Sequence, residues 1–72
     1  MSGSDKFARV TPRQLQIWEG VARGKMNKEI ARDLGISDLT IKLHTYALFR
    51  KLNVNSRTQL ALEWYSIDWR PK

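Results

Sequence analysis

Apolar positions recur at helical spacing along most of the chain, and no segment alternates between polar and apolar residues as a strand does. Helix-capping residues such as Thr11, Ser37 and Ser56, and stop signals such as Gly24 and Gly35, divide the chain into separate helices. The helices are predicted over about residues 12–23, 27–34, 38–52 and 57–67. The predicted fold class is therefore all-α, with four helices.

The predicted third helix has two different faces. One face carries a mainly apolar stripe that is expected to pack in the core and that consists of Ile41, Thr45, Leu48 and Leu52. The opposite stripe mixes cations, leucines and a phenol, and consists of Leu39, Lys42, Leu43, Tyr46 and Arg50. A purely solvated face is normally polar throughout, so this stripe is expected to touch a partner. The alternative is that Leu39 and Leu43 pack on a neighbouring helix or are singly exposed, which is common.

The length of 72 residues allows one small domain. We expect residues 1–9 to be a tag remnant and linker, residues 10–68 to be the folded domain and residues 69–72 to be a tail, since Pro71 cannot continue a helix. With no cysteine and a single histidine, the chain is predicted to hold no disulfide, no metal and no cofactor. It has no apolar run of membrane-spanning length and no leader, which favours a cytoplasmic domain with no membrane partner.

The excess of positive charge indicates what kind of partner the chain binds. The formal net charge is +6, and residues 25–57 contain seven cations against three carboxylates. Cations held near phosphates release condensed counterions, which supplies most of the sequence-independent affinity for DNA. A short helix, a glycine turn and a long helix in this basic segment are typical of a helix-turn-helix. The same excess of cations is also found on ordinary solvated surfaces.

Six short segments resemble, in order and in spacing, the LuxR-type (GerE-type) helix-turn-helix domain. Residues 10–15 are similar to the LTPRE opening of that family, and residues 27–31 match its NKEIA segment. The remaining segments, which match the family's turn and its TVKxH, RKLxV and SRTQ segments, are residues 34–37, 40–44, 50–54 and 56–59. The resemblance covers about residues 10–65. It implies a four-helix DNA-binding domain that serves as the output module of a bacterial transcription regulator.

The resemblance also implies roles for individual residues. The helix over about residues 38–52 is expected to enter the major groove of double-stranded DNA, where Lys42, Leu43 and Tyr46 match positions that contact bases. Expected phosphate contacts are Lys28, Thr40, His44, Arg50, Lys51 and Arg57. As alternatives, Thr40 only helps to cap its helix, His44 is a partly buried spacer, and the lysines and Arg57 are solubilising charges.

The fourth helix matches the dimerisation helix of the family, which favours a homodimer on DNA and, indirectly, RNA polymerase as a partner. Leu62, Tyr65 and Trp69 are candidates for its outward apolar face, unless they fold back onto the core. An enzyme is not expected, because no paired carboxylates, nucleophile–base pair or glycine-rich phosphate loop are present. The alternative functions are a protein-interaction module and a sigma-factor-like promoter-recognition domain.

One departure from the family concerns the start of the second helix. Met26 stands where the family generally has Ser or Thr, and its thioether cannot replace the oxygen that accepts an amide hydrogen bond. We expect either that Asn27 caps this helix or that its first turn frays. Tyr46 and Phe49 also make the third helix more aromatic than is usual in the family.

Overall fold

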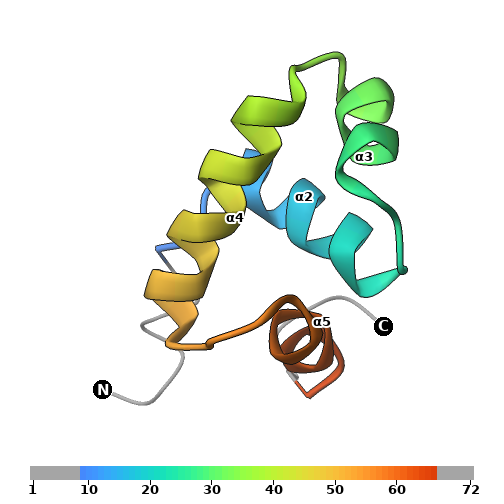
Figure 1. Cartoon of the computed structure of the whole chain (residues 1–72). Helices are drawn as coiled ribbons and strands as arrows, with labels where there is room; N and C mark the ends of the chain where they lie inside the picture. The colour runs from blue at the N-terminus through green and yellow to red at the C-terminus, as the bar shows by residue number, and fades with distance from the viewer. Residues whose placement is uncertain (1–8, 67–72) are drawn as a thin grey trace.

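The structure, a computed structural model, describes residues 9–66 and contains four helices and no strand in that range (Figure 1). The helices are α2 over Pro12–Ala22, α3 over Asn27–Leu34, α4 over Asp38–Leu52 and α5 over Arg57–Tyr65. The all-α prediction is confirmed, and the bounds agree with the expected ones to within two residues at each end. None of the helices in the described part of the chain is long and apolar enough to span a membrane.

The helix boundaries follow from local hydrogen bonds. At the start of α2 the Gln14 amide donates to Thr11 Oγ1, and the Thr11 amide donates to Gln14 Oε1, both at 3.1 Å. At the start of α5 the Gln59 amide donates to Ser56 Oγ at 3.1 Å, but Gln59 Oε1 accepts from the amide of Asn55. This end is therefore capped by a variant of the capping box, shifted by one residue in its second bond.

The second helix is capped differently from either expectation. Met26 is its N-cap residue and makes no side-chain capping bond, yet its amide donates to Glu29 Oε1 at 2.7 Å. Asn27 does not cap the helix, because it is the first helical residue and its Oδ1 accepts a hydrogen bond from Arg57. The first turn is thus held by half of a capping box, and the expectations of an Asn27 cap or a frayed turn were wrong.

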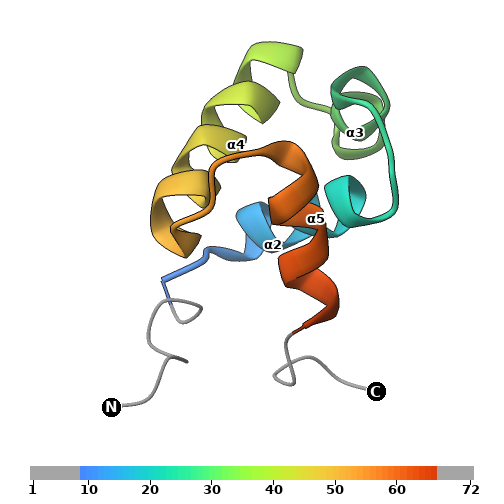
Figure 2. The same cartoon turned by 60° about the horizontal axis from the view of Figure 1, so that its bottom comes forward.

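The central helix of the fold is α2, which packs against α3, α4 and α5. In Figure 2 α5 crosses in front of α2, with α3 and α4 behind it. Trp18 is fully buried in this centre, donates from Nε1 to the Leu60 carbonyl at 2.7 Å and meets the ring of Trp64 edge-on at 5.3 Å. Because α2 is covered on three sides, Ile17 and Gln14 are buried as well, beyond the single face that periodicity predicts.

The segment from α3 to α4 has the geometry of a helix-turn-helix. Gly35 ends α3 with φ of +69°, a left-handed conformation that suits glycine, and Ser37 then caps α4. The predicted core stripe of α4 is buried along its whole length, and it consists of Ile41, Thr45, Leu48 and Leu52. The opposite face of α4 consequently points away from the other three helices (Figure 1).

Candidate nucleic-acid interface

Every residue of the outward stripe of α4 is exposed to solvent. The exposed fractions are 63% for Leu39, 58% for Leu43 and 54% for Tyr46, and Lys42 and Arg50 are exposed as well. Leu39 and Leu43 therefore do not pack on a neighbouring helix of the chain, which removes one of the two alternatives left by the sequence. The other alternative, isolated exposed leucines, fits poorly, because Leu39, Leu43 and Tyr46 follow one another along the same row.

The ring of Tyr46 is placed by an aromatic neighbour one turn further along α4. Its centroid lies 6.3 Å from that of Phe49, with the ring planes inclined by 54°. Phe49 is half-buried and packs against the core, so it is anchored while Tyr46 is exposed. Tyr46 and Phe49 thus form one unit, in which the inner ring supports the outer one.

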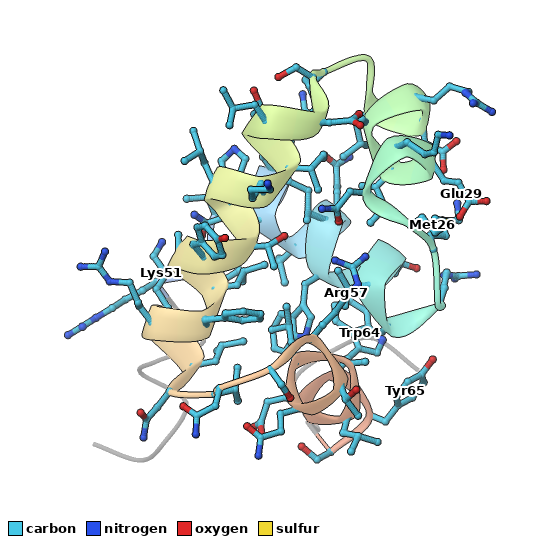
Figure 3. The ribbon with its side chains drawn as sticks, viewed as in Figure 1. Met26, Glu29, Lys51, Arg57, Trp64 and Tyr65 are labelled. Atoms are coloured by element: carbon cyan, nitrogen blue, oxygen red, sulfur yellow. The ribbon has the colours of Figure 1, made fainter. Side chains whose placement is uncertain are left out.

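The cations predicted to contact DNA, Lys42 at a base and the others at phosphates, divide into two groups. Within residues 9–66, no hydrogen bond or ion pair holds the side chains of Lys28, Lys42 or Arg50, all of which are exposed. Lys51, in contrast, donates from Nζ to the Arg9 carbonyl at 2.7 Å and to Gln14 Oε1 at 2.8 Å. Its ammonium group therefore joins the end of α4 to the start of α2 (Figure 3).

Arg57 is also bound within the chain. From the first residue of α5 its guanidinium donates to Asn27 Oδ1 and to the Lys25 carbonyl, each at 2.7 Å (Figure 3). These two bonds connect α5 to the loop before α3, across 30 or more residues of sequence. The reading of Lys51 and Arg57 as plain solubilising charges is wrong for this reason.

Lys28 and Arg57 are nevertheless brought together at one surface hollow. The hollow lies where α3, α4 and α5 begin, and it is lined by Met26, Asn27, Lys28, Asp38 and Arg57. Helix N-termini carry a partial positive charge, which adds to the two cations and opposes the one carboxylate. The hollow is an electrostatically suitable place for an anion beside the start of α4.

The carboxylates of the α2–α3 side are largely neutralised by their own partners. Glu19 pairs with Arg23 at 2.8 Å, and Asp33 pairs with Lys25 at 2.6 Å. On α4 the only carboxylate is Asp38, in the first turn, whereas Arg50 and Lys51 occupy the last turn. The outward face of α4 is therefore positive from its second turn onward.

Thr40 and His44 have more restricted positions than the exposed cations. The Thr40 hydroxyl lies 2.8 Å from Ser37 Oγ, and the Thr40 amide donates to the same oxygen at 3.1 Å. Thr40 thus takes part in the cap of α4, as the sequence alternative held. His44 is half-buried between the two stripes of α4.

The candidate dimerisation residues are only partly accounted for. Leu62 is 63% exposed on α5. Tyr65 is 59% exposed, but its hydroxyl donates to the Ala22 carbonyl at 2.9 Å, so it both folds back onto α2 and presents its ring to solvent (Figure 3). Trp69 lies outside the described residues.

The sequence did not predict which residues accept hydrogen bonds from Lys51 and Arg57. Gln14, three residues after Thr11, is recognisable from the sequence only as the glutamine of a capping box, although its Oε1 also accepts from Lys51, and Asn27 was considered only as a cap. No local sequence pattern predicts the pairs Lys51–Gln14 and Arg57–Asn27, whose members are 37 and 30 residues apart. A polar residue at a position that packs inward, as Gln14 is, was the only available signal.

Comparison with known proteins gives a consistent family. The family model described as "Bacterial regulatory proteins, luxR family" matches residues 8–64. The chain is 42% identical over 60 residues to the glycerol metabolism activator of Pseudomonas putida, covering 83% of this chain and 27% of that protein. It is 47% identical over 53 residues to the nitrate/nitrite response regulator protein NarP of Escherichia coli, covering 74% of this chain and 25% of that protein.

A solved structure agrees with the sequence matches. The response regulator StyR superposes with a TM-score of 0.83 at 36% identity, over 89% of this chain and 32% of that one. The chain thus spans about a quarter to a third of the length of these relatives. A TM-score of 0.83 shows that the matching part of StyR shares the fold of this chain.

Proposed function

Because this chain belongs to the luxR family of bacterial regulatory proteins, we propose that it binds double-stranded DNA sequence-specifically through the outward face of α4. The observation that carries this proposal is the open row of Lys42, Leu43 and Tyr46 on the second helix of a helix-turn-helix. In that motif the second helix lies in the major groove while the first crosses the phosphate backbone. The domain would be the output module of a cytoplasmic transcription regulator.

The chemistry of the row suits base edges. The ammonium group of Lys42 can donate to O6 and N7 of guanine, and the Leu43 side chain can contact the methyl group of thymine. Tyr46 offers either its hydroxyl or its ring. None of these side chains has to leave a partner within residues 9–66 in order to reach DNA, so no intramolecular bond is lost on binding.

The phosphate backbone is proposed to be held by residues around this row. Lys28 on α3 and Arg50 on α4 are free to pair with phosphates, and the half-buried Thr40 and His44 lie in the first half of α4. Arg57 has unused N–H donors beyond the two that hold Asn27 and Lys25. Lys51 has one N–H left, so its contribution to a phosphate contact is the smallest of the set.

Specific binding is tested by titration of a duplex recovered by selection from a random pool, together with a scrambled duplex, at several salt concentrations. Binding to both duplexes is expected to weaken steeply with salt, because phosphate neutralisation releases counterions. Lys42→Ala is expected to cost about 1–3 kcal/mol on the selected duplex and to relax the preference at one base position. Lys28→Ala is the matched control and should weaken both duplexes about equally.

Two outcomes would overturn this assignment. If Lys42→Ala weakens both duplexes equally, Lys42 does not read a base. If binding is absent or insensitive to salt, the alternative of a protein-interaction module gains, since the exposed leucines and Tyr46 would then serve a partner helix.

We also propose that two copies assemble on DNA through α5, with Leu62, Tyr65 and Trp69 at the contact and RNA polymerase as an indirect partner. A nine-residue helix offers little area, well below the roughly 1,200 Å² that stable complexes bury. Sedimentation is therefore expected to show a monomer or a weak dimer without DNA, and two copies on a duplex with two half-sites. A tight dimer without DNA would contradict the small interface.

A further inference from the structure

Leu39 is the most exposed leucine on α4 and has no role in the site as built so far. It is the second residue of the helix, and it lies one turn before Leu43 on the outward row. The exposed fractions of the two residues, 63% and 58%, leave more than half of each open to a partner. The first residues of the second helix in a helix-turn-helix are the ones that reach base edges, so Leu39 is placed as favourably as Leu43.

The outward row offers few hydrogen bonds over this stretch. Of the outward-stripe residues between 39 and 46, only Lys42 and Tyr46 can donate a hydrogen bond from the side chain, and none of them is Arg, Asn or Gln. Bidentate contacts to guanine come from Arg or Lys and those to adenine from Asn or Gln, so Lys42 is the one side chain of this stretch that can make such a contact. An apolar side chain in the major groove has one base-specific feature to contact, the C5 methyl group of thymine.

We propose that Leu39 and Leu43 together recognise two thymine methyl groups, so that the DNA site is selected by methyl contacts as much as by hydrogen bonds. This inference rests on the proposed function. Residues four apart on a helix are separated by about 6 Å along its axis, and base pairs along a DNA strand by about 3.4 Å. The two methyl groups are therefore expected about two base-pair steps apart when α4 lies along the groove.

Deoxyuridine gives a direct test, because it lacks only the C5 methyl group and keeps the hydrogen-bonding edge of thymine. Each thymine of a duplex recovered by selection is replaced singly by deoxyuridine, and the affinity of the unmodified protein is measured. Two positions are expected to lose about fourfold in affinity each, the value for one methyl-sized group removed from water. The other positions should be indifferent.

Leucine variants assign the two positions. Leu39→Ala should abolish the uracil sensitivity at one position and Leu43→Ala at the other, with the melting temperature of the protein unchanged because both side chains are exposed. Leu62→Ala removes an equally exposed leucine from α5 and should leave the ratio of thymine to uracil affinities as it was, whatever its effect on overall binding. Restoring the methyl group as 5-methylcytosine in a C·G pair at the same position should recover part of the loss.

The results that overturn the proposal are distinct from failure of the proposed function. If the protein prefers its selected duplex but is indifferent to uracil at every position, sequence-specific binding stands and the methyl contacts are refuted. If uracil weakens binding equally for the unmodified protein and both alanine variants, the effect comes from DNA shape, and the proposal is again refuted. A protein that shows no preference among duplexes would refute the proposed function itself.

Discussion

Lys42 and Arg50 on the outward face of α4 extend into solvent, whereas Lys51 at the end of the same helix and Arg57 at the start of α5 are bound within the chain. The two groups have the same charge and lie in the same basic segment. They differ in what binding to a phosphate would require. A free cation can neutralise a phosphate at no cost to the fold, while a bound one must share its donors or release a partner.

The faces of α4 differ in the same way for apolar residues. Leu48 is fully buried in the core, while Leu43 on the opposite side is mostly exposed, although both are leucines in one regular helix. Inward side chains stabilise the domain, and outward ones are available to a partner. Together the two comparisons separate the residues that hold this domain together from those that can recognise something outside it.

The largest change in stability is expected when the buried Leu48 and the exposed Leu43 are each replaced by alanine. Leu48→Ala should lower the free energy of unfolding by about 2–5 kcal/mol, because it removes a fully buried side chain and leaves a cavity. Leu43→Ala should change it by less than about 0.5 kcal/mol, as is usual for exposed positions. Urea unfolding followed by circular dichroism measures both values. Comparable losses in the two variants would mean that Leu43 is covered in solution.

The next effect concerns the guanidinium that joins α5 to the loop before α3. Arg57→Ala should destabilise the fold by about 1–3 kcal/mol, because two hydrogen bonds from a charged donor are lost together. Arg57→Lys is the matched control, since it keeps the charge but lacks the planar fork that reaches two acceptors at once. Thermal unfolding should rank the proteins as unmodified, lysine variant and alanine variant. A lysine variant as stable as the unmodified protein would show that the bridge contributes nothing beyond charge.

The sequence was sufficient for the fold because the signals that define it are local. Caps, glycine stops and periodic apolar residues act within one or two turns, and they gave the four helices and the buried stripe of α4. The outward row was predicted for the same reason, since exposing one face follows from burying the other. The burial of Gln14 was not predicted, because it depends on α2 being surrounded by three helices.

The sequence could not predict which cationic side chains are free and which are hydrogen-bonded within the chain. Whether a lysine is free or bound depends on which carbonyls and amides the folded chain brings near it, and the partners of Lys51 lie 42 and 37 residues away. Periodicity carries no information about such pairs. The resemblance to a family predicts phosphate contacts for these positions, and the structure shows that two of them, Lys51 and Arg57, are bound within the domain.

A smaller change in stability is expected to distinguish the bound Lys51 from the free Lys42. Lys51→Met keeps the length and apolar stem of the side chain but loses the bonds to Arg9 and Gln14, and should cost about 0.5–1.5 kcal/mol of stability. Lys42→Met should leave stability unchanged and affect DNA binding alone. Both are measured by urea unfolding together with binding titrations over a range of salt. If Lys51→Met is fully stable yet lowers the salt slope by about one, Lys51 is a phosphate ligand rather than a tether.

The smallest expected effect is a gain in stability at the start of α3. Met26 has the extended backbone of an N-cap, with φ of −82° and ψ of 158°, and its side chain is exposed, so a serine fits there without rearrangement. The serine hydroxyl could accept from the Glu29 amide and complete the capping box whose other half, Met26 amide to Glu29 Oε1, is already formed. Met26→Ser is therefore expected to stabilise the domain by about 0.5–1 kcal/mol, in the lower part of the range for caps, because the Glu29 amide already donates to the Met26 carbonyl.

Met26→Ala is the control for this last change, since it removes the same methionine without supplying an acceptor. Thermal unfolding of the three proteins should place the serine variant highest and the alanine variant level with the unmodified protein. A serine variant no better than the alanine variant would show that the Glu29 side chain alone secures this turn. In that case the bonds from the Met26 amide to Glu29 and from Arg57 to Asn27 are sufficient to hold the start of α3, and the missing side-chain cap does not lower the stability.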